Sequence, residues 1–237
     1  MSSERLWRDA VNVAAIFAVA GKTLGGLRVR ARSGPVRDRF ISLIERLIED
    51  PIRRVPSTTP IDRLLGGLDL IATLTANRPI ADKGLLVDCN GRSVALTMAE
   101  RTPTMTASIW ARALDTGMIS TERDGASNRW PPTFSLLAID EGIDDEEPPA
   151  NLLDRLALSV DLNAIGLRDL AKCEFERNQI QAAERRFSLI SVSDAQLKQV
   201  AEASLVLGIS SIRPIKFAIT TARAHAAING RDRVTDE

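Results

Sequence analysis

The fold is decided by residues 24–39, which read Leu-Gly-Gly-Leu-Arg-Val-Arg-Ala-Arg-Ser-Gly-Pro-Val-Arg-Asp-Arg. The apolar pattern predicts a short strand over 27–31, and the Ser-Gly-Pro sequence after it predicts a turn. A helix is expected to begin near Pro35, because apolar residues then recur at the spacing of one helix face, at Phe40, Ile41, Leu43, Ile44, Leu47 and Ile48. This order of strand, turn and helix is the one in which a phosphate-binding P-loop occurs.

The turn lacks the chemistry of a working P-loop, whose pattern is Gly-x-x-x-x-Gly-Lys-Ser/Thr. In register with Gly34, this chain has Pro35, Val36, Arg37 and Asp38. Proline removes one backbone N–H, the β-branched valine replaces a flexible glycine, and arginine lacks the compact ammonium group of lysine. Asp38 places a carboxylate where a hydroxyl would bind Mg²⁺, and there it would repel phosphate. These substitutions predict a turn that is complete without a nucleotide.

The composition narrows the possible functions. The 237 residues carry 31 Lys or Arg and 31 Asp or Glu, and aromatic residues make up 4% with no Tyr. Because single-stranded nucleic acid is bound by exposed aromatic rings, no nucleic-acid partner is expected. The charges are unevenly placed, since a basic N-terminal part precedes an acidic loop over 140–147. These regions either form solvated patches or meet across a subunit boundary.

Cysteine and histidine usage argues against metal binding and nucleophilic catalysis. Cys89 and Cys173 lie far apart without CxxC spacing, and the single histidine, His225, lies on a predicted alanine-rich helix. No metal site is therefore expected, and a reduced cytoplasmic location fits this pattern. The longest apolar run, residues 13–20, is too short to span a bilayer. We expect neither a transmembrane helix nor a signal peptide.

Strands and helices alternate before residue 165. Asn90-Gly91 between two apolar runs predicts a hairpin over 84–98, and Asp124-Gly125 predicts a second hairpin that joins 118–123 to 130–139. Residues 57–60 predict a hydroxyl-capped helix start. We predict an α/β core over 1–165, with a mainly parallel sheet and inserted hairpins, and a helical bundle over 166–237. Helices are expected over 4–20, 104–115, 167–185, 194–207 and 212–229, and further strands over 51–55 and 157–162.

The chain resembles the AAA+ ATPases, and more narrowly the N-terminal AAA+ region of the D subunit of magnesium chelatase. The order of parts is similar: a turn at the P-loop position, a strand ending in Ala-Glu, an apolar strand, Leu-Leu-Asp-Arg, and a helical lid. The resemblance covers essentially the whole chain. Six strings carry it in order, namely Leu24-Gly25-Gly26, Arg32-Ser33-Gly34-Pro35-Val36-Arg37-Asp38-Arg39, Asp62-Arg63-Leu64-Leu65-Gly66-Gly67-Leu68-Asp69, Met98-Ala99-Glu100-Arg101, Ala113-Leu114-Asp115-Thr116-Gly117 and Leu152-Leu153-Asp154-Arg155-Leu156.

This resemblance implies an AAA+ αβα sandwich with a C-terminal helical lid and a role in chlorophyll or bacteriochlorophyll synthesis. The family's enzyme combines an ATP-hydrolysing motor subunit, the D subunit that assembles with it in a ring, and a large porphyrin-binding subunit where Mg²⁺ enters protoporphyrin IX. Family D subunits continue into an acidic, proline-rich linker and an integrin I-like domain. Neither is present here, so we expect a truncated chain.

Further positions correspond to AAA+ nucleotide-site residues. In the Walker B motif an Asp holds Mg²⁺ and a Glu orients water, whereas this chain has Ala99 and Glu100. Glu100 alone lacks a metal partner, and an ordinary acid after a strand explains it equally well. Where the motor subunit has a polar sensor, this chain has Asp140 and Glu141, which would disfavour a γ-phosphate. The resemblance thus implies a degenerate site.

Two arginines match positions that AAA+ proteins use around phosphates. Arg155 lies in the Leu-Leu-Asp-Arg string, close to where AAA+ rings present an arginine to the neighbouring subunit's nucleotide, and Arg213 matches the lid sensor position. An arginine given in trans can act even when its own subunit's pocket is inactive. Alternatively, Arg155 only pairs with Asp154 or the acidic loop. Both interpretations remain open at this point.

The resulting hypothesis is a non-hydrolysing AAA+ platform and regulatory subunit of magnesium chelatase. This domain is expected to bind no cofactor tightly, because ATP and Mg²⁺ are used by the partner motor subunit. One alternative is a self-sufficient ATPase of the MoxR or chelatase-motor kind with an atypical P-loop. Another is a generic α/β interaction domain.

Overall fold

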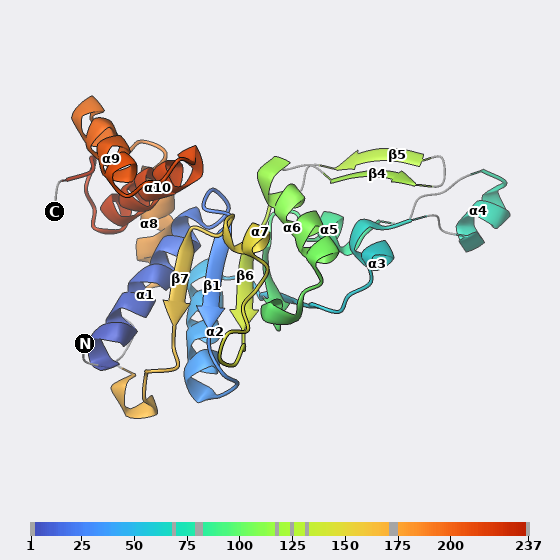
Figure 1. Cartoon of the computed structure of the whole chain (residues 1–237), viewed down its shortest axis with the longest axis horizontal. Coiled ribbons are helices and arrows are strands. Elements are labelled where there is room, and N and C mark those ends of the chain that lie inside the picture. The colour runs from blue at the N-terminus through green and yellow to red at the C-terminus, as the bar shows by residue number, and fades with distance from the viewer. Residues whose placement is uncertain are drawn as a thin grey trace. The chain divides into compact units, whose positions relative to one another are not determined.

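The computed structural model of the protein describes residues 3–67, 70–78, 83–116, 119–123, 126–130, 133–170 and 175–235 (Figure 1). The α-helices are α1 (Ser3–Ala20), α2 (Pro35–Ile48), α3 (Ile61–Leu65), α4 (Leu70–Ala76), α5 (Leu85–Asp88), α6 (Thr104–Thr116), α7 (Ala150–Leu153), α8 (Arg177–Phe187), α9 (Asp194–Val206) and α10 (Ile212–Ile228), and short 3₁₀ turns cover Ala99–Arg101 and Leu167–Asp169. The strands are β1 (Gly26–Arg30), β2 (Arg53–Pro56), β3 (Ser93–Thr97), β4 (Ile119–Arg123), β5 (Ala126–Trp130), β6 (Ser135–Asp140) and β7 (Leu158–Asp161).

A five-stranded sheet has the order β2-β3-β6-β1-β7. Val29 lies opposite Val160 in the parallel β1–β7 pair, and Val94 lies opposite Leu136 in the parallel β3–β6 pair. All six residues of β6 are buried, as expected for a strand covered on both faces. The predicted mainly parallel sheet is confirmed. The antiparallel pair β4–β5 forms a separate two-stranded sheet.

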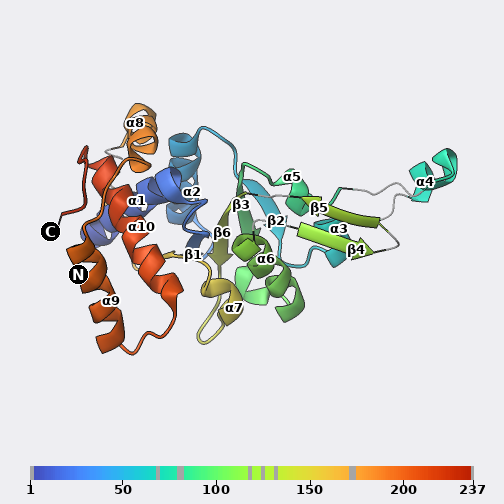
Figure 2. The same cartoon turned by 90° about the horizontal axis from the view of Figure 1, so that it is seen from above.

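Two compact units divide the chain, one comprising Met1–Pro51 with Leu156–Glu237 and the other Ile52–Arg155. In the first unit, α1 packs against α2, α8 and α10 (Figure 2). Trp7 of α1 is 2% exposed and meets the Phe40 ring of α2 edge-on, with centroids 6.4 Å apart. Val19 of α1 packs against a small core of the lid formed by Ala183, Ile190, Ala226 and Ala227. Buried apolar contacts therefore join the lid helices to the first helix of the chain. The sequence-based division at residue 165 remains a prediction.

The predicted hairpin over 84–98 is wrong. Residues 85–88 form the short helix α5, which buries Leu86, and β3 pairs in parallel with both β2 and β6. Because β3 already has a partner on each side, it cannot pair with the residues before it. Asn90-Gly91 still turns the chain, with Gly91 at a φ of 79°, but the turn is held by Thr133, whose N–H donates to Asn90 Oδ1 and whose carbonyl accepts from the Gly91 N–H.

Three other local predictions need correction. The second hairpin is shorter than predicted, because β4 pairs only with β5 while β6 joins the main sheet; its tip lies outside the described residues. The helix predicted from 167 begins at Arg177 instead, after a single 3₁₀ turn. The hydroxyl cap predicted before α3 is absent, because Pro60 is the N-cap and the Thr59 hydroxyl donates to the Pro56 carbonyl at 2.7 Å.

The helix starts predicted near Pro35 and at residue 194 are confirmed. Pro35 is the first residue of α2, where its missing N–H costs no helical hydrogen bond. Ser193 caps α9 through a capping box with Gln196, in which each side chain accepts from the other's backbone N–H. Gly230 follows α10 with a φ of 72°. Within the described residues, no helix has the length and apolarity that crossing a membrane requires.

Candidate functional site

The turn that replaces the P-loop connects β1 to α2 through residues 31–34. The backbone N–H of Arg32 donates to Asn163 Oδ1 at 3.0 Å, and the Asn163 N–H in turn donates to Asp161 Oδ1 at 2.9 Å. Arg37 folds back, so that its Nη2 donates to the Ser33 hydroxyl at 3.0 Å. The Arg32 N–H and one terminal nitrogen of Arg37, which could otherwise meet a phosphate, are therefore already engaged within the chain.

The start of α2 follows from the same residues. Gly34 is the N-cap without a side-chain cap, and its carbonyl accepts the Asp38 N–H at 3.1 Å. Pro35 contributes no N–H, and Asp38 places a negative charge in the first turn, where it complements the helix dipole. A phosphate at the start of α2 would be repelled by this carboxylate, which already complements the positive end of the helix dipole. The residues present therefore fit a nucleotide phosphate poorly.

The Walker B and sensor positions meet at the carboxyl ends of β3 and β6. The Glu100 side chain is 1% exposed, and its Oε2 accepts the backbone N–H of Glu141 at 3.0 Å. Arg101 lies 3.6 Å from the other Glu100 oxygen. Asp140 is fully buried, and its Oδ1 accepts the Gly142 N–H at 2.9 Å. Both buried carboxylates thus hold the start of the acidic loop.

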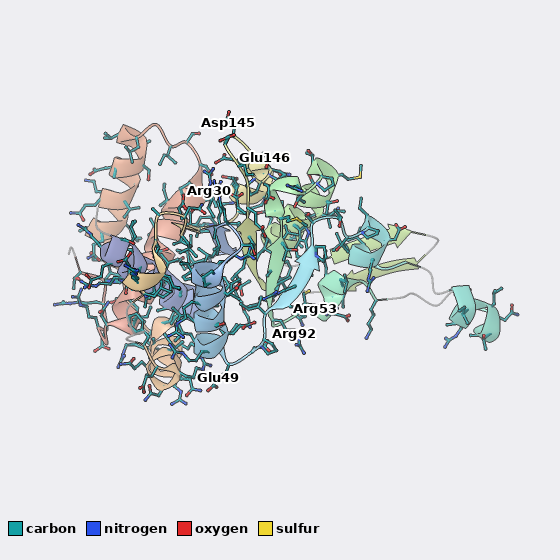
Figure 3. The ribbon with its side chains drawn as sticks, turned by 90° about the horizontal axis from the view of Figure 1, so that it is seen from below. Arg30, Glu49, Arg53, Arg92, Asp145 and Glu146 are labelled. Atoms are coloured by element: carbon teal, nitrogen blue, oxygen red, sulfur yellow. The ribbon has the colours of Figure 1, made fainter. Side chains whose placement is uncertain are left out.

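Ala99 and Glu100, at the Walker B position, have structural surroundings. Ala99 is buried, and Met98 before it has a φ of 52°, a left-handed conformation uncommon for a residue other than glycine. The Glu100 carboxylate binds the loop after β6, whose tip carries the labelled Asp145 and Glu146 (Figure 3). Glu100 therefore has a structural partner in the position where a catalytic glutamate would orient water.

Arg155 is held by contacts from two helices. Its Nε and Nη2 lie 2.8 and 2.6 Å from Asp115 Oδ2 at the end of α6, and its Nη1 donates to the Asn151 carbonyl of α7 at 2.6 Å. Asp154 lies farther away, at 3.6 Å from Nη1. The sequence interpretation named Asp154 or the acidic loop as the alternative partner, and it missed Asp115, which lies 40 positions away along the chain.

Arg213 lies at the start of the last helix of the lid. Its backbone N–H donates to the Ser211 hydroxyl, the N-cap of α10, at 3.3 Å. With Lys216, Phe217 and Thr23 it lines a cavity of about 450 Å³. The cavity combines two cationic side chains with an apolar ring and hydroxyl groups.

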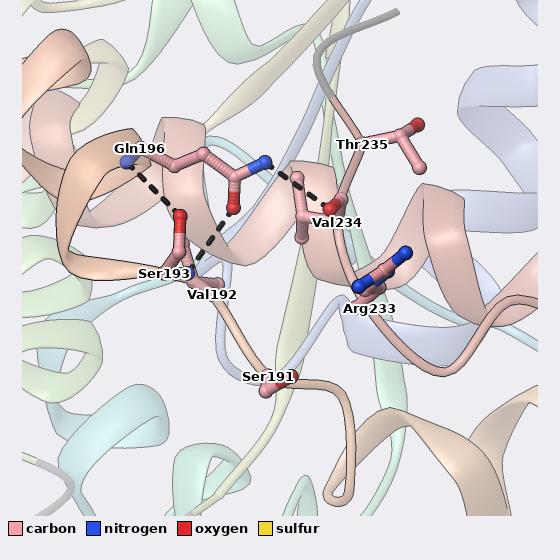
Figure 4. Close-up of a pocket in the computed structure, with 7 residues that line it drawn as sticks. All are labelled: Ser191, Val192, Ser193, Gln196, Arg233, Val234 and Thr235. Carbon is pink, nitrogen blue, oxygen red and sulfur yellow. Dashed lines mark hydrogen bonds between the residues drawn. The ribbon is translucent and has the colours of Figure 1, made fainter.

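A second cavity of about 570 Å³ lies in the lid beside the N-terminus of α9 (Figure 4). The segment that includes Val234 runs parallel to Ser191, and the Val234 N–H donates to the Ser191 carbonyl at 3.2 Å. Gln196 connects both walls, because its Oε1 accepts from the Ser193 N–H while its Nε2 donates to the Val234 carbonyl at 3.1 Å. Its further lining residues are Val192, Arg233 and Thr235.

The cysteines and the histidine are the side chains that could act as nucleophiles or metal ligands. Cys89 is fully buried, and burial raises the pKa of its thiol to about 11. Cys173 lies outside the described residues. His225 is exposed on α10. Among the residues that the structure describes, no group of three or more His, Cys, Asp or Glu side chains could hold a metal ion.

Comparisons with known proteins identify related chains. Over 98% of its length, the chain is 34% identical to the magnesium-chelatase 60 kDa subunit of Cereibacter sphaeroides, of which it covers 38%. The corresponding subunit of Rhodobacter capsulatus is 32% identical over 94% of the chain, which covers 37% of that protein. The magnesium-chelatase 38 kDa subunit of Chlorobaculum parvum is 26% identical over 79% of the chain, which covers 60% of it. The chain thus spans about two fifths of the length of the 60 kDa relatives.

A family match and a structural comparison agree with these relatives. Residues 197–237 match the AAA lid domain family. The crystal structure of a candidate ATPase from Cytophaga hutchinsonii superposes with a TM-score of 0.66, covering 99% of this chain and 83% of that chain at 12% identity. The names of the relatives show that Chlorobaculum tepidum has both a 67 kDa and a 38 kDa magnesium-chelatase subunit. The chain is therefore homologous, over nearly all of its length, to part of the D-type subunit of magnesium chelatase, and it has an α/β AAA+ fold with a C-terminal helical lid.

Proposed function

We propose that this chain is a non-hydrolysing AAA+ platform of magnesium chelatase. In this role it assembles with the ATPase motor subunit and regulates it, while a large porphyrin-binding subunit receives Mg²⁺ into protoporphyrin IX. ATP and Mg²⁺ are then bound by the motor subunit, and the assembly works in the cytoplasm. The observation that carries the proposal is the hydrogen bonding of the turn that replaces the P-loop. Asn163 Oδ1 accepts from the Arg32 N–H, and Arg37 donates to the Ser33 hydroxyl.

Phosphoryl transfer needs a site that holds both the phosphates and Mg²⁺. A working site supplies converging backbone N–H groups, a lysine for the β and γ phosphates, and oxygen ligands for Mg²⁺. Here Pro35 lacks an N–H, Asp38 adds a negative charge, and Ala99 replaces the metal-binding Asp. Glu100, which would orient water, accepts the Glu141 N–H instead. The backbone donors, the binding of anionic phosphate, the Mg²⁺ ligand and the water-orienting group are therefore each weakened by a separate residue.

The first test is nucleotide binding by the purified chain. We expect no saturable binding of Mg-ATP at micromolar concentration by calorimetry, and no ATP turnover above a buffer control, because the turn offers too few donors. The double variant Arg37→Lys/Asp38→Thr restores the two side chains that the P-loop pattern requires. Tight binding and turnover by the unaltered chain, unchanged in the double variant, would contradict the proposal and support a self-sufficient ATPase.

A further inference from the structure

Arg155 is fixed in one orientation by the ends of α6 and α7. Its side chain is 21% exposed, and both Nε and Nη2 approach the same Asp115 oxygen, at 2.8 and 2.6 Å. Asn151 supplies its carbonyl to Nη1, and its own side-chain amide donates to the Ser108 hydroxyl of α6 at 3.0 Å. A charged hydrogen bond on one side and a backbone carbonyl on the other therefore set the plane of the guanidinium group.

The contacts leave part of the guanidinium group available. An arginine side chain has five N–H groups, and those to Asp115 and Asn151 use three of them. One of the two remaining N–H groups is on Nη1, which faces Asp154 only at 3.6 Å. Asp154 is also more exposed, at 51% against 33% for Asp115. Asp115 is therefore the carboxylate that determines where the remaining donors point.

We infer that Asp115 is a positioning residue that presents Arg155 to a phosphate oxygen of ATP bound by a neighbouring subunit. This inference rests on the proposed function, in which the motor subunit carries the nucleotide. An arginine held in place beforehand loses less side-chain freedom when it binds an anion, so its effect on the developing charge of phosphoryl transfer is larger. Asp115 acts through Arg155 and does not itself touch the nucleotide.

The experiment measures ATP hydrolysis by the complex of this chain with the motor subunit of the same organism. We expect Asp115→Asn to lower kcat about tenfold, with the KM for ATP within about twofold, because the amide loses the charge that fixes Arg155. Asp115→Glu keeps the carboxylate and is expected to restore part of the rate. The matched control, Asp154→Asn, removes the more distant acid and is expected to change kcat by less than about twofold.

Arg155→Ala separates this inference from the function on which it rests. We expect it to lower kcat at least tenfold, and we expect the Asp115→Asn/Arg155→Ala double variant to be no slower than Arg155→Ala alone. Normal assembly and unchanged hydrolysis in Arg155→Ala would overturn the action in trans itself. A reduced rate in Arg155→Ala with an unchanged rate in both Asp115 variants would overturn only the role of Asp115. Co-elution in size-exclusion chromatography establishes assembly for every variant, and Asp115→Glu decides the question if Asp115→Asn does not assemble.

Discussion

Cys89 shows how strongly one buried side chain depends on its surroundings. Burial is the largest effect on its thiol and raises the pKa from 9.0 to about 11, while the nearby charges of Arg53 and Arg92 act in the opposite direction (Figure 3). The neutral thiol is therefore favoured in the folded chain. In an unfolded chain the same group titrates near its ordinary value.

This difference predicts a loss of stability at high pH. Between about pH 9 and 11 the folded chain binds more protons at Cys89 than the unfolded chain, so the free energy of unfolding falls as pH rises, by about 2 to 3 kcal/mol in total. Urea unfolding across this pH range, in a Cys173→Ser background, measures the effect. Cys89→Ala is the control, and the same slope in that variant would assign the loss to other groups.

Residue-scale prediction from the sequence had a clear physical limit. The substitutions in the turn were visible because each departs from a short, contiguous pattern. The partner of Arg155 was not visible, because Asp115 is 40 positions away and only the packing of α7 on α6 brings the two together. Asn163, which takes the Arg32 N–H, was missed for the same reason.

Arginine side chains form hydrogen bonds at both ends of helix α8. At its start, Arg177 donates to the Leu47 carbonyl at 2.8 Å and pairs with Glu184 at 2.9 Å. After its end, Arg223 of α10 donates to the Phe187 and Ile190 carbonyls at 3.0 and 3.1 Å, and lies 5.0 Å from the centre of the Phe187 ring. Arg223 thus binds the last carbonyl of α8 and one carbonyl of the segment that follows the helix.

Arg223→Ala is expected to destabilise the lid by about 1 to 3 kcal/mol, because it leaves the two partly buried carbonyls of Phe187 and Ile190 without this donor. Arg223→Lys should recover only part of the loss, since one ammonium group cannot reproduce the spread of the guanidinium donors. Hydrogen exchange of the amides in α8 and residues 188–191 measures the change. Arg185→Ala, at an exposed position of α8, is the matched control and should stay within about 0.5 kcal/mol. Equal protection in the two alanine variants would contradict the role of Arg223.

Among the helices, the sequence predicted well those with a clear start signal, such as Pro35 for α2 and the residues at the start of α9. It failed where tertiary pairing overrides a local signal. Asn90-Gly91 favours a hairpin locally, yet β3 is paired on both sides by parallel strands, so the preceding residues form a helix.

The proposed platform role requires that the chain assembles with the motor subunit. A chain that spans about two fifths of its 60 kDa relatives has the AAA+ fold, and this is the part that we expect to contact the motor subunit. Mixing the two proteins should give a complex of larger mass in analytical ultracentrifugation, and its stability should depend on ATP, because the proposed role assigns nucleotide binding to the motor subunit. The motor subunit alone is the control. Failure to co-assemble with or without ATP would contradict the platform role.

The double use of Gln196 has a consequence for chemical ageing of the protein. Its amide serves the start of α9 through the oxygen and holds Val234 through the nitrogen. Deamidation to glutamate would keep the capping box, in which glutamate is equally suitable, but would set a carboxylate against the Val234 carbonyl. A single spontaneous reaction would therefore remove one of the hydrogen bonds that hold the segment around Val234, while the capping box of the helix beside it stays intact.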